Sequence, residues 1–265
     1  FVYLGFRVYG AIIGTIIGVF IAFIISVLNL RYVLRSKEEK SDTQNIYRYT
    51  APAFIINLCV IAFYSVDIII ARFVFDETTA GIYAIASILG KVIFWGTQPV
   101  SKAMFPIASD NGKNKEKNIF ASSILIVGML ILLALLVFYF APDYIVKLFS
   151  GKEVYESAKI LFFVGCSNGL IAIANLVMLY KLSKKRIVRY SLLIIPLIFE
   201  VFLLIYSAKN IYQFSIAFII ASAFFLFVSV FVVKNKESQS QQVKGHSLSL
   251  KMETDENERN QATSY

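Results

Sequence analysis

The sequence predicts an all-α integral membrane protein with about seven transmembrane helices. Hydrophobic residues fill 58% of its 265 positions, against about 45–50% in a soluble domain. The mean hydropathy is +0.69. The apolar residues are gathered into long runs, each close to the ~20 residues that a helix needs to cross a bilayer. We predict spans at residues 8–30, 49–74, 81–107, 119–140, 158–180, 187–206 and 212–233.

The polar connections between the spans predict the orientation. Loops 31–48, 108–118 and 181–189 together hold 13 Lys and Arg residues, whereas the loops on the other face hold four. Because Lys and Arg are enriched in cytoplasmic loops, we expect the first set and the C-terminus to be cytoplasmic. The tail at 234–265 has almost no apolar residues, so we expect it to be disordered. The chain opens on Phe1 inside apolar sequence, and we expect it to be part of a longer protein.

The charge and the cysteines exclude some other classes. The net charge of +9 does not indicate nucleic-acid binding, because the basic residues lie in short loops between apolar runs. Cys59 and Cys166 both lie within apolar runs, and their separation matches neither a metal site nor a disulfide framework. We therefore expect no cofactor, no metal ion and no nucleic-acid partner.

A helical hairpin at 49–107 carries the charges that are hardest to place in a membrane. Asp67 lies in its first span, a polar turn follows at 76–81, and Lys91 lies in its second span. We expect this second run to stop at Pro106. A charge at the centre of a span costs about 2.5–3.5 kcal/mol by insertion scales, so ionisable residues there are candidates for function.

Polar side chains of the second span share one face of the predicted helix. At about 100° per residue, they lie within about 100° of one another. They are Tyr83, Ser87, Lys91, Gln98 and Lys102. We expect a stripe of this length to face a polar interior or a water-filled cavity rather than lipid.

Each charged residue of the hairpin also has an alternative interpretation. Lys91 would form a structural ion pair with Asp67. Lys102, near the end of its span, would extend its side chain to the cytoplasmic interface. Arg72 is as well placed to anchor the helix at the outer interface as to line a cavity. The sequence leaves these alternatives open.

Two later features complete the candidate residues. Apolar positions in the segment 141–156 recur at helical spacing, as in a short helix lying along the outer interface. In the span 187–206, Pro196 is expected to kink the helix. Glu200 lies deep in the same span. A proton- or ion-coupled transporter needs an intramembrane group that changes charge, so Asp67 and Glu200 are the candidates for coupling to H+ or Na+. The alternative for Glu200 is a neutral, hydrogen-bonded acid, which burial favours.

Several short runs carry a resemblance to a known family. They are VDIIIA at 66–71, TAGIYA at 79–84, LGK at 89–91, FP at 105–106 and LFSGKEVY at 148–155. In the last run, Ser150 interrupts the Leu-Phe-Gly type of turn common in that family. Up to about residue 233 the chain resembles the second half of a bacterial polysaccharide-repeat (lipid-linked oligosaccharide) flippase, of the multidrug/oligosaccharidyl-lipid/polysaccharide exporter superfamily.

The resemblance implies two lobes of six helices around a central cavity, which work by alternating access. Residues 1–30 would then be the last helix of a first lobe, and 31–48 a cytoplasmic linker. Residues 49–233 would form a complete second lobe, followed by a cytoplasmic tail at 234–265. The missing N-terminal lobe would be an intramolecular partner.

The resemblance also implies the cargo and the membrane. Such proteins move an oligosaccharide on undecaprenyl pyrophosphate from the cytoplasmic to the outer leaflet of the bacterial inner (plasma) membrane, for capsule, lipopolysaccharide or exopolysaccharide synthesis. An anionic head group needs cationic partners shielded from lipid. Lys91 is our first candidate, followed by Arg72 and Lys102. The polar residues Gln98, Ser87 and Tyr83 would line the same cavity, and membrane lipids would surround the helices.

Other functions fit the sequence less well. A cation-coupled multidrug or metabolite antiporter of the same superfamily should favour acidic cavity groups, and this hairpin carries more basic ones. A membrane glycosyltransferase or polymerase needs catalytic groups in a sizeable outer loop, whereas the predicted outer loops have only about 5–17 residues. A purely structural scaffold has no reason to carry a polar stripe through a span. We therefore predict a transporter and not an enzyme.

Overall fold

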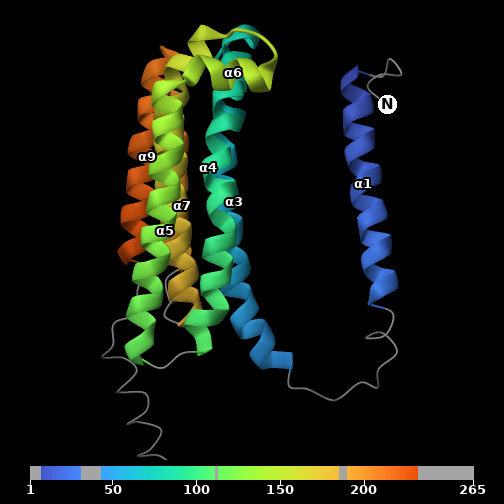
Figure 1. Ribbon diagram of the computed structural model, residues 1–265, viewed down its shortest axis with the longest axis vertical. Coiled ribbons are helices and arrows are strands. Elements are labelled where there is room, and N and C mark those ends of the chain that lie inside the picture. The colour runs from blue at the N-terminus through green and yellow to red at the C-terminus, as the bar shows by residue number, and fades with distance from the viewer. Residues whose placement is uncertain (1–6, 31–42, 111–112, 185–189, 232–265) are drawn as a thin grey trace, which may run out of the picture. The chain divides into compact units, whose positions relative to one another are not determined.

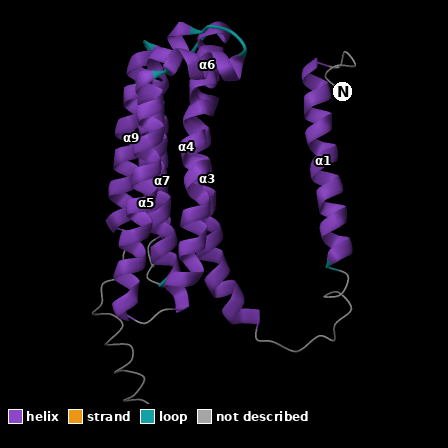
Figure 2. Ribbon diagram, viewed as in Figure 1, coloured by secondary structure: helices purple, strands orange, loops and turns teal. Residues whose placement is uncertain are grey.

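The computed structural model describes residues 7–30, 43–110, 113–184 and 190–231, where every regular element is a helix (Figures 1 and 2). The α-helices are α1 (Arg7–Asn29), α3 (Thr43–Val74), α4 (Glu77–Asp110), α5 (Lys113–Phe140), α6 (Pro142–Ser150), α7 (Tyr155–Ser183), α8 (Ile194–Tyr206) and α9 (Ile211–Phe231). A 3₁₀ helix, η2 (Tyr190–Leu193), precedes α8. The chain divides into two units, residues 1–47 and 48–265.

The predicted all-α membrane fold is confirmed. Within the described ranges, six helices are long and apolar enough to cross a membrane, and Ser191–Tyr206 is a shorter apolar helix. The chain is a multi-pass membrane protein. The predicted tail at 234–265 and most of the predicted linker at 31–48 lie outside the described residues. The assignment of lobes therefore stays a prediction.

Asp76 makes the turn between α3 and α4 tighter than the sequence suggested. We expected a polar turn over 76–81, but α4 already begins at Glu77. The carboxylate Oδ2 of Asp76 accepts hydrogen bonds from the backbone N–H groups of Thr78 and Thr79, each at 3.1 Å. These bonds satisfy donors that the first turn of a helix leaves free. Hydrogen bonds from Thr79 also lower the pKa of the Asp76 carboxyl below its usual 3.8.

Helix α4 continues through two prolines. We expected the span to stop at Pro106, but the helix includes both Pro99 and Pro106 and ends at Asp110. Proline has a helical φ, and its cost is the lost hydrogen bond to the preceding turn. Transmembrane helices tolerate this loss when neighbouring groups satisfy the freed carbonyls. At the end of α4, the Lys184 ammonium from the end of α7 donates to the carbonyl of Ala108, where the helix dipole favours a cation.

From the sequence we expected Pro196 to kink a continuous span at 187–206. In the structure η2 precedes α8, and Pro196 lies in the first turn of α8. Proline is tolerated in a first turn because its missing N–H has no partner inside the helix. The irregularity is thus a change from 3₁₀ to α-helix just before Pro196 rather than a kink in a continuous helix. The start of the predicted span, at 187–189, lies outside the described residues.

The predicted short helix between the fourth and fifth spans is present as α6. It ends at Gly151, whose φ of 70° is a left-handed conformation that glycine adopts without strain. Val146 is buried, whereas Tyr144, Leu148 and Phe149 are exposed. Exposed apolar side chains suit a helix at a membrane interface, and that location stays a prediction.

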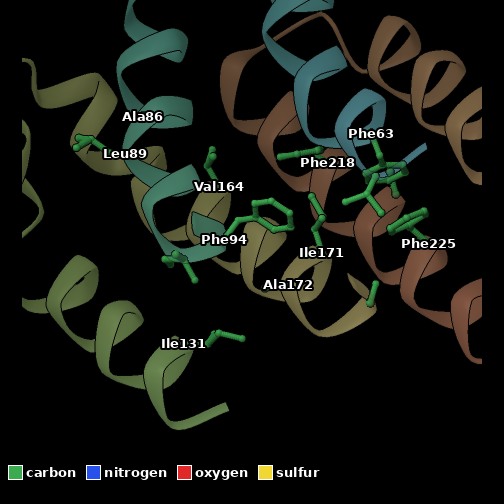
Figure 3. Packing of buried hydrophobic residues seen from close by; sticks show 14 of the residues in the cluster. Phe63, Ala86, Leu89, Phe94, Ile131, Val164, Ile171, Ala172, Phe218 and Phe225 are labelled. Atoms are coloured by element: carbon green, nitrogen blue, oxygen red, sulfur yellow. The ribbon is translucent and has the colours of Figure 1, made fainter. Parts of the chain in front are cut away.

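Helix α7 is the centre of the second unit. It packs against α4, α5, α6 and α9, and most of its membrane-length segment is buried. Figure 3 shows this core, where Val164 and Ile171 of α7 lie among side chains from α3, α4, α5 and α9. Glycine permits a close approach of α4 to α7: a Cβ built on Gly90 of α4 would lie 2.9 Å from Cγ1 of Val164. This packing fixes α4, and with it the polar face of that helix.

Candidate functional site

The candidate site is built around Asp67, a fully buried carboxylate of α3. It lies seven residues before the end of α3 at Val74, or ~10 Å at 1.5 Å per residue. An ionised carboxylate in hydrocarbon is costly unless it is paired and hydrogen-bonded. The partners of Asp67 therefore decide what this site is able to do.

Helix α4 supplies those partners from three successive turns. Tyr83, Ser87 and Lys91 are four residues apart and so lie one above the other on one helix face. The Tyr83 hydroxyl donates to Oδ2 of Asp67 at 3.1 Å, and the Ser87 hydroxyl donates to the same oxygen. The Lys91 ammonium pairs with Oδ1 of Asp67 at 3.1 Å. Both oxygens of the carboxylate are thus satisfied, one by neutral donors and one by a cation.

Aromatic rings hold the two ends of this row of donors. The Tyr83 ring packs edge-on against Phe214 of α9, with ring centroids 4.9 Å apart. At the other end, the Lys91 ammonium lies 5.8 Å from the centre of the Tyr64 ring, within the range of a cation–π interaction. The side chain of Lys91 is 12% exposed, whereas that of Asp67 is not exposed at all. Lys91 is therefore the member of the pair whose side chain reaches the surface of the unit.

Glu200 of α8 is a second buried carboxyl near this cluster. It lies six residues before the end of α8, or ~9 Å, a depth close to that of Asp67. It interacts electrostatically with Asp67 and Lys91. Glu200 is fully buried, and neither of its carboxyl oxygens has a hydrogen-bond partner among the described residues. Such a group is stable in an apolar environment only as the neutral acid.

The other predicted site residues lie elsewhere on the hairpin. Arg72 forms an exposed ion pair with Glu77, at 3.0 Å between Nη2 and Oε1, at the turn between α3 and α4. Gln98 is half-buried and Lys102 is exposed, and neither contributes a hydrogen bond to Asp67. The predicted stripe therefore divides into two parts. Tyr83, Ser87 and Lys91 are gathered on Asp67, and the rest of the stripe is not.

An apolar cavity lies on another side of α4. It has a volume of about 320 Å³ and is lined by residues of α4 and α5, including Val92, Gly96 and Leu133. Lys91 is not part of its lining. The ion pair of the alternative interpretation is thus present in this conformation, and the head-group role of Lys91 stays a prediction.

Sequence reasoning missed three features of the site. The hydrogen bonds from Tyr83 and Ser87 to Asp67 could have been predicted, because Tyr83, Ser87 and Lys91 follow one another at intervals of four residues and so share a helix face. The cation–π contact of Lys91 with Tyr64 could also have been predicted, because Tyr64 lies one turn before Asp67 on the same helix face. No sequence signal indicates that Glu200 lacks a partner, because that depends on how α8 packs.

One comparison with known proteins identifies the family. Residues 1–132 of the 265, about half of the chain, match the model of a family described as polysaccharide biosynthesis protein. The matched segment includes Asp67 and all three of its partners. No curated protein and no solved structure matches the chain. The chain belongs to the polysaccharide biosynthesis protein family.

Proposed function

We propose that this chain is part of a transporter, not an enzyme, that moves a lipid-linked oligosaccharide across the bacterial inner membrane by alternating access. The proposed cargo is an undecaprenyl-pyrophosphate oligosaccharide, carried from the cytoplasmic to the outer leaflet. The observation that carries the proposal is the ammonium of Lys91. The backbone of Lys91 lies about 21 Å along α4 from Glu77, and its ammonium reaches back to Asp67, ~10 Å from the end of α3. Both residues lie in the segment that matches the family.

The pairing of Lys91 is suited to exchange with an anionic head group. If the ammonium turns from Asp67 to a phosphate, the carboxylate keeps the hydroxyl donors of Tyr83 and Ser87. Loss of every partner would cost the full desolvation penalty of a buried charge, and the two hydroxyls lower that cost. Tyr83 and Ser87 are fully buried in this conformation, so we assign them to holding Asp67 here. Asp67 and a pyrophosphate would then compete for one cation.

Arg72 and Lys102 would meet the head group at other depths. Lys102 lies 11 residues beyond Lys91 on α4, a separation of ~16 Å. Gln98 lies between them on the same face. Arg72 lies at the opposite end, paired with Glu77. Cations spaced along the membrane would give an anion successive partners as the two lobes rock.

Asp67 and Glu200 remain our candidates for ion coupling. We favour H+ over Na+ at Glu200, because neither of its carboxyl oxygens has a hydrogen-bond partner among the described residues, which suits a neutral, protonated acid. Loss of its proton would add a second buried negative charge that interacts electrostatically with both Asp67 and Lys91. The two buried acids also support the second candidate, a cation-coupled antiporter of the same superfamily. Drug efflux by the intact protein would favour that reading.

The test compares export of surface polysaccharide in cells that lack their own flippase. Lys91→Met should abolish export, because the variant retains Asp67 but has no cation for the head group. Lys91→Met combined with Asp67→Asn removes both charges and restores a neutral, hydrogen-bonded core. A head-group role predicts that this double variant reaches the membrane but does not export.

Lys152→Met is the matched control, since this exposed lysine lies in the turn between α6 and α7. Its export should equal that of the wild type. Full export by the double variant would mean that the ion pair is only structural, and the proposed role of Lys91 would be lost.

A further inference from the structure

A second hollow lies away from the Asp67 cluster, where α8 ends and α9 begins. This α8–α9 groove has a volume of about 250 Å³. Its lining consists of Leu203, Tyr206, Ser207, Lys209, Gln213, Ile216, Ala217 and Ile220. The described part of the chain shows no function for it, and it is independent of the proposed transport site.

The groove is polar at one end and apolar at the other. Tyr206, Lys209 and Gln213 lie at the turn between the helices, whereas Ile216 and Ile220 continue along α9 into the membrane. Gln213 and Ile220 are seven residues apart, or ~10 Å along the helix. A polar mouth at the end of a span, above an apolar channel parallel to the helix, matches the division of a phospholipid into head group and acyl chain.

The only charge among the lining residues is positive. Lys209 is exposed, and no carboxylate of the described residues lies within ion-pair distance of it. Two other basic residues at this end of the bundle form ion pairs: Arg72 with Glu77 at 3.0 Å and Lys147 with Glu153 at 2.7 Å. A basic residue beside an apolar membrane surface attracts anionic lipid head groups.

We propose that the α8–α9 groove binds one anionic phospholipid. Its phosphate accepts hydrogen bonds from Lys209 and Gln213, and the first part of an acyl chain lies along Ile216 and Ile220. Charge complementarity favours this occupant over a helix of a second copy of the chain. A packed helix would bury the Lys209 ammonium without a partner, which is costly, whereas a phosphate both pairs with it and leaves it at the water boundary.

The experiment measures phospholipid binding to the purified chain in detergent by native mass spectrometry. The probes are phosphatidylglycerol and phosphatidylcholine with the same acyl chains. Lys209→Gln should weaken phosphatidylglycerol binding about fivefold and leave phosphatidylcholine binding unchanged. Ile216→Trp, which fills the apolar part of the groove, should weaken phosphatidylglycerol binding while Lys209 is intact. Ile216 is about half exposed, so this variant is expected to fold.

Lys152→Gln is the control, because Lys152 is exposed at the same end of the bundle but lies outside the groove. Its affinity for phosphatidylglycerol should match that of the wild type. An equal loss in Lys152→Gln and Lys209→Gln would show diffuse attraction to surface charge and overturn the proposal. Unchanged binding in Lys209→Gln would also overturn it, as would a dimer of the chain that excludes lipid from the groove. None of these results depends on whether the protein transports oligosaccharide.

Discussion

The ion pair between Lys91 and Asp67 allows a quantitative test of the site. Removing one partner of a buried pair costs about 3–5 kcal/mol, because the other charge is left without compensation. Lys91→Met leaves a fully buried carboxylate with two hydroxyl donors, so we expect a loss of about 3 kcal/mol, at the lower end of that range. Asp67→Asn keeps an acceptor for the hydroxyls but leaves the ammonium unpaired, with a similar expected cost.

The double variant should behave differently from either single variant. With Asn at position 67 and Met at position 91, no charge remains, and the amide oxygen still accepts from Tyr83 and Ser87. Neutral replacement of a buried ion pair is often close to neutral for stability. We therefore expect the double variant to lie within about 1 kcal/mol of the wild type, which gives a coupling energy of several kcal/mol between the two positions.

The protein contains its own reporter for this measurement. Trp95 is the single tryptophan of the chain and lies one turn beyond Lys91 on α4. Its ring is 6.2 Å from the ring of Tyr64, the residue under the Lys91 ammonium. Unfolding by a denaturing detergent in mixed micelles, followed by Trp95 fluorescence, gives the free energy of unfolding of each variant.

These single and double variants form a double-mutant cycle. Its control is the ion pair of Arg72 with Glu77, whose side chains are 59% and 86% exposed. Exposed pairs contribute about 0–1 kcal/mol, so Arg72→Met and Glu77→Gln should change the free energy of unfolding little. If the two single losses at positions 67 and 91 simply add in the double variant, the residues do not interact, and the electrostatic account of the site is wrong.

Four further variants test the scaffold. Gly90→Ala should cost about 1–3 kcal/mol in the same unfolding assay, because the new Cβ would meet Val164 at 2.9 Å. Gly128→Ala, where nothing lies within 4 Å, should be neutral or stabilise by up to about 1 kcal/mol. Lys181→Met should cost about 1–3 kcal/mol, because the ammonium donates to two carbonyls in the last turn of α9. Asp76→Asn should lower the melting temperature at neutral pH; since the folded-state pKa of Asp76 is lowered, the difference from the wild type should shrink as the pH falls below about 3.8.

Most of the fold was predictable because hydrophobic runs of membrane length have few alternative structures. Helices must satisfy every backbone group within the membrane, so the runs set the number and order of the spans. The ends of helices were harder to place. Asp76 starts α4 earlier than expected, and α4 continues past Pro106, because local capping and freed carbonyls are properties of packed helices rather than of composition.

The candidate site was predictable only along a single helix. The shared face of Tyr83, Ser87 and Lys91 follows from their spacing, and Asp67 was the evident acidic partner. The sequence did not determine which residues of that face contact α3 and which are exposed. It therefore grouped Lys102 with residues that the structure separates from it. The environment of Glu200 depends on how α8 packs in the bundle, which the spacing of residues along the sequence does not predict.

The two buried carboxyls of this bundle should respond in opposite ways to replacement by leucine. Asp67 has three donors, so Asp67→Leu leaves the Lys91 ammonium and the hydroxyls of Tyr83 and Ser87 without their acceptor, and we expect a loss of about 3–5 kcal/mol. Glu200 has no hydrogen-bond partner to lose among the described residues. Glu200→Leu replaces an unsatisfied polar group by an apolar one of similar size, which should be neutral or stabilising. The free energies of unfolding of both variants, measured by Trp95 fluorescence, test whether the two replacements have these opposite effects. A loss in Glu200→Leu as large as that in Asp67→Leu would show that Glu200 is charged and paired in the membrane. That result would remove the reason for assigning it a proton, whereas a stable Glu200→Leu variant that no longer couples transport to pH would support the assignment.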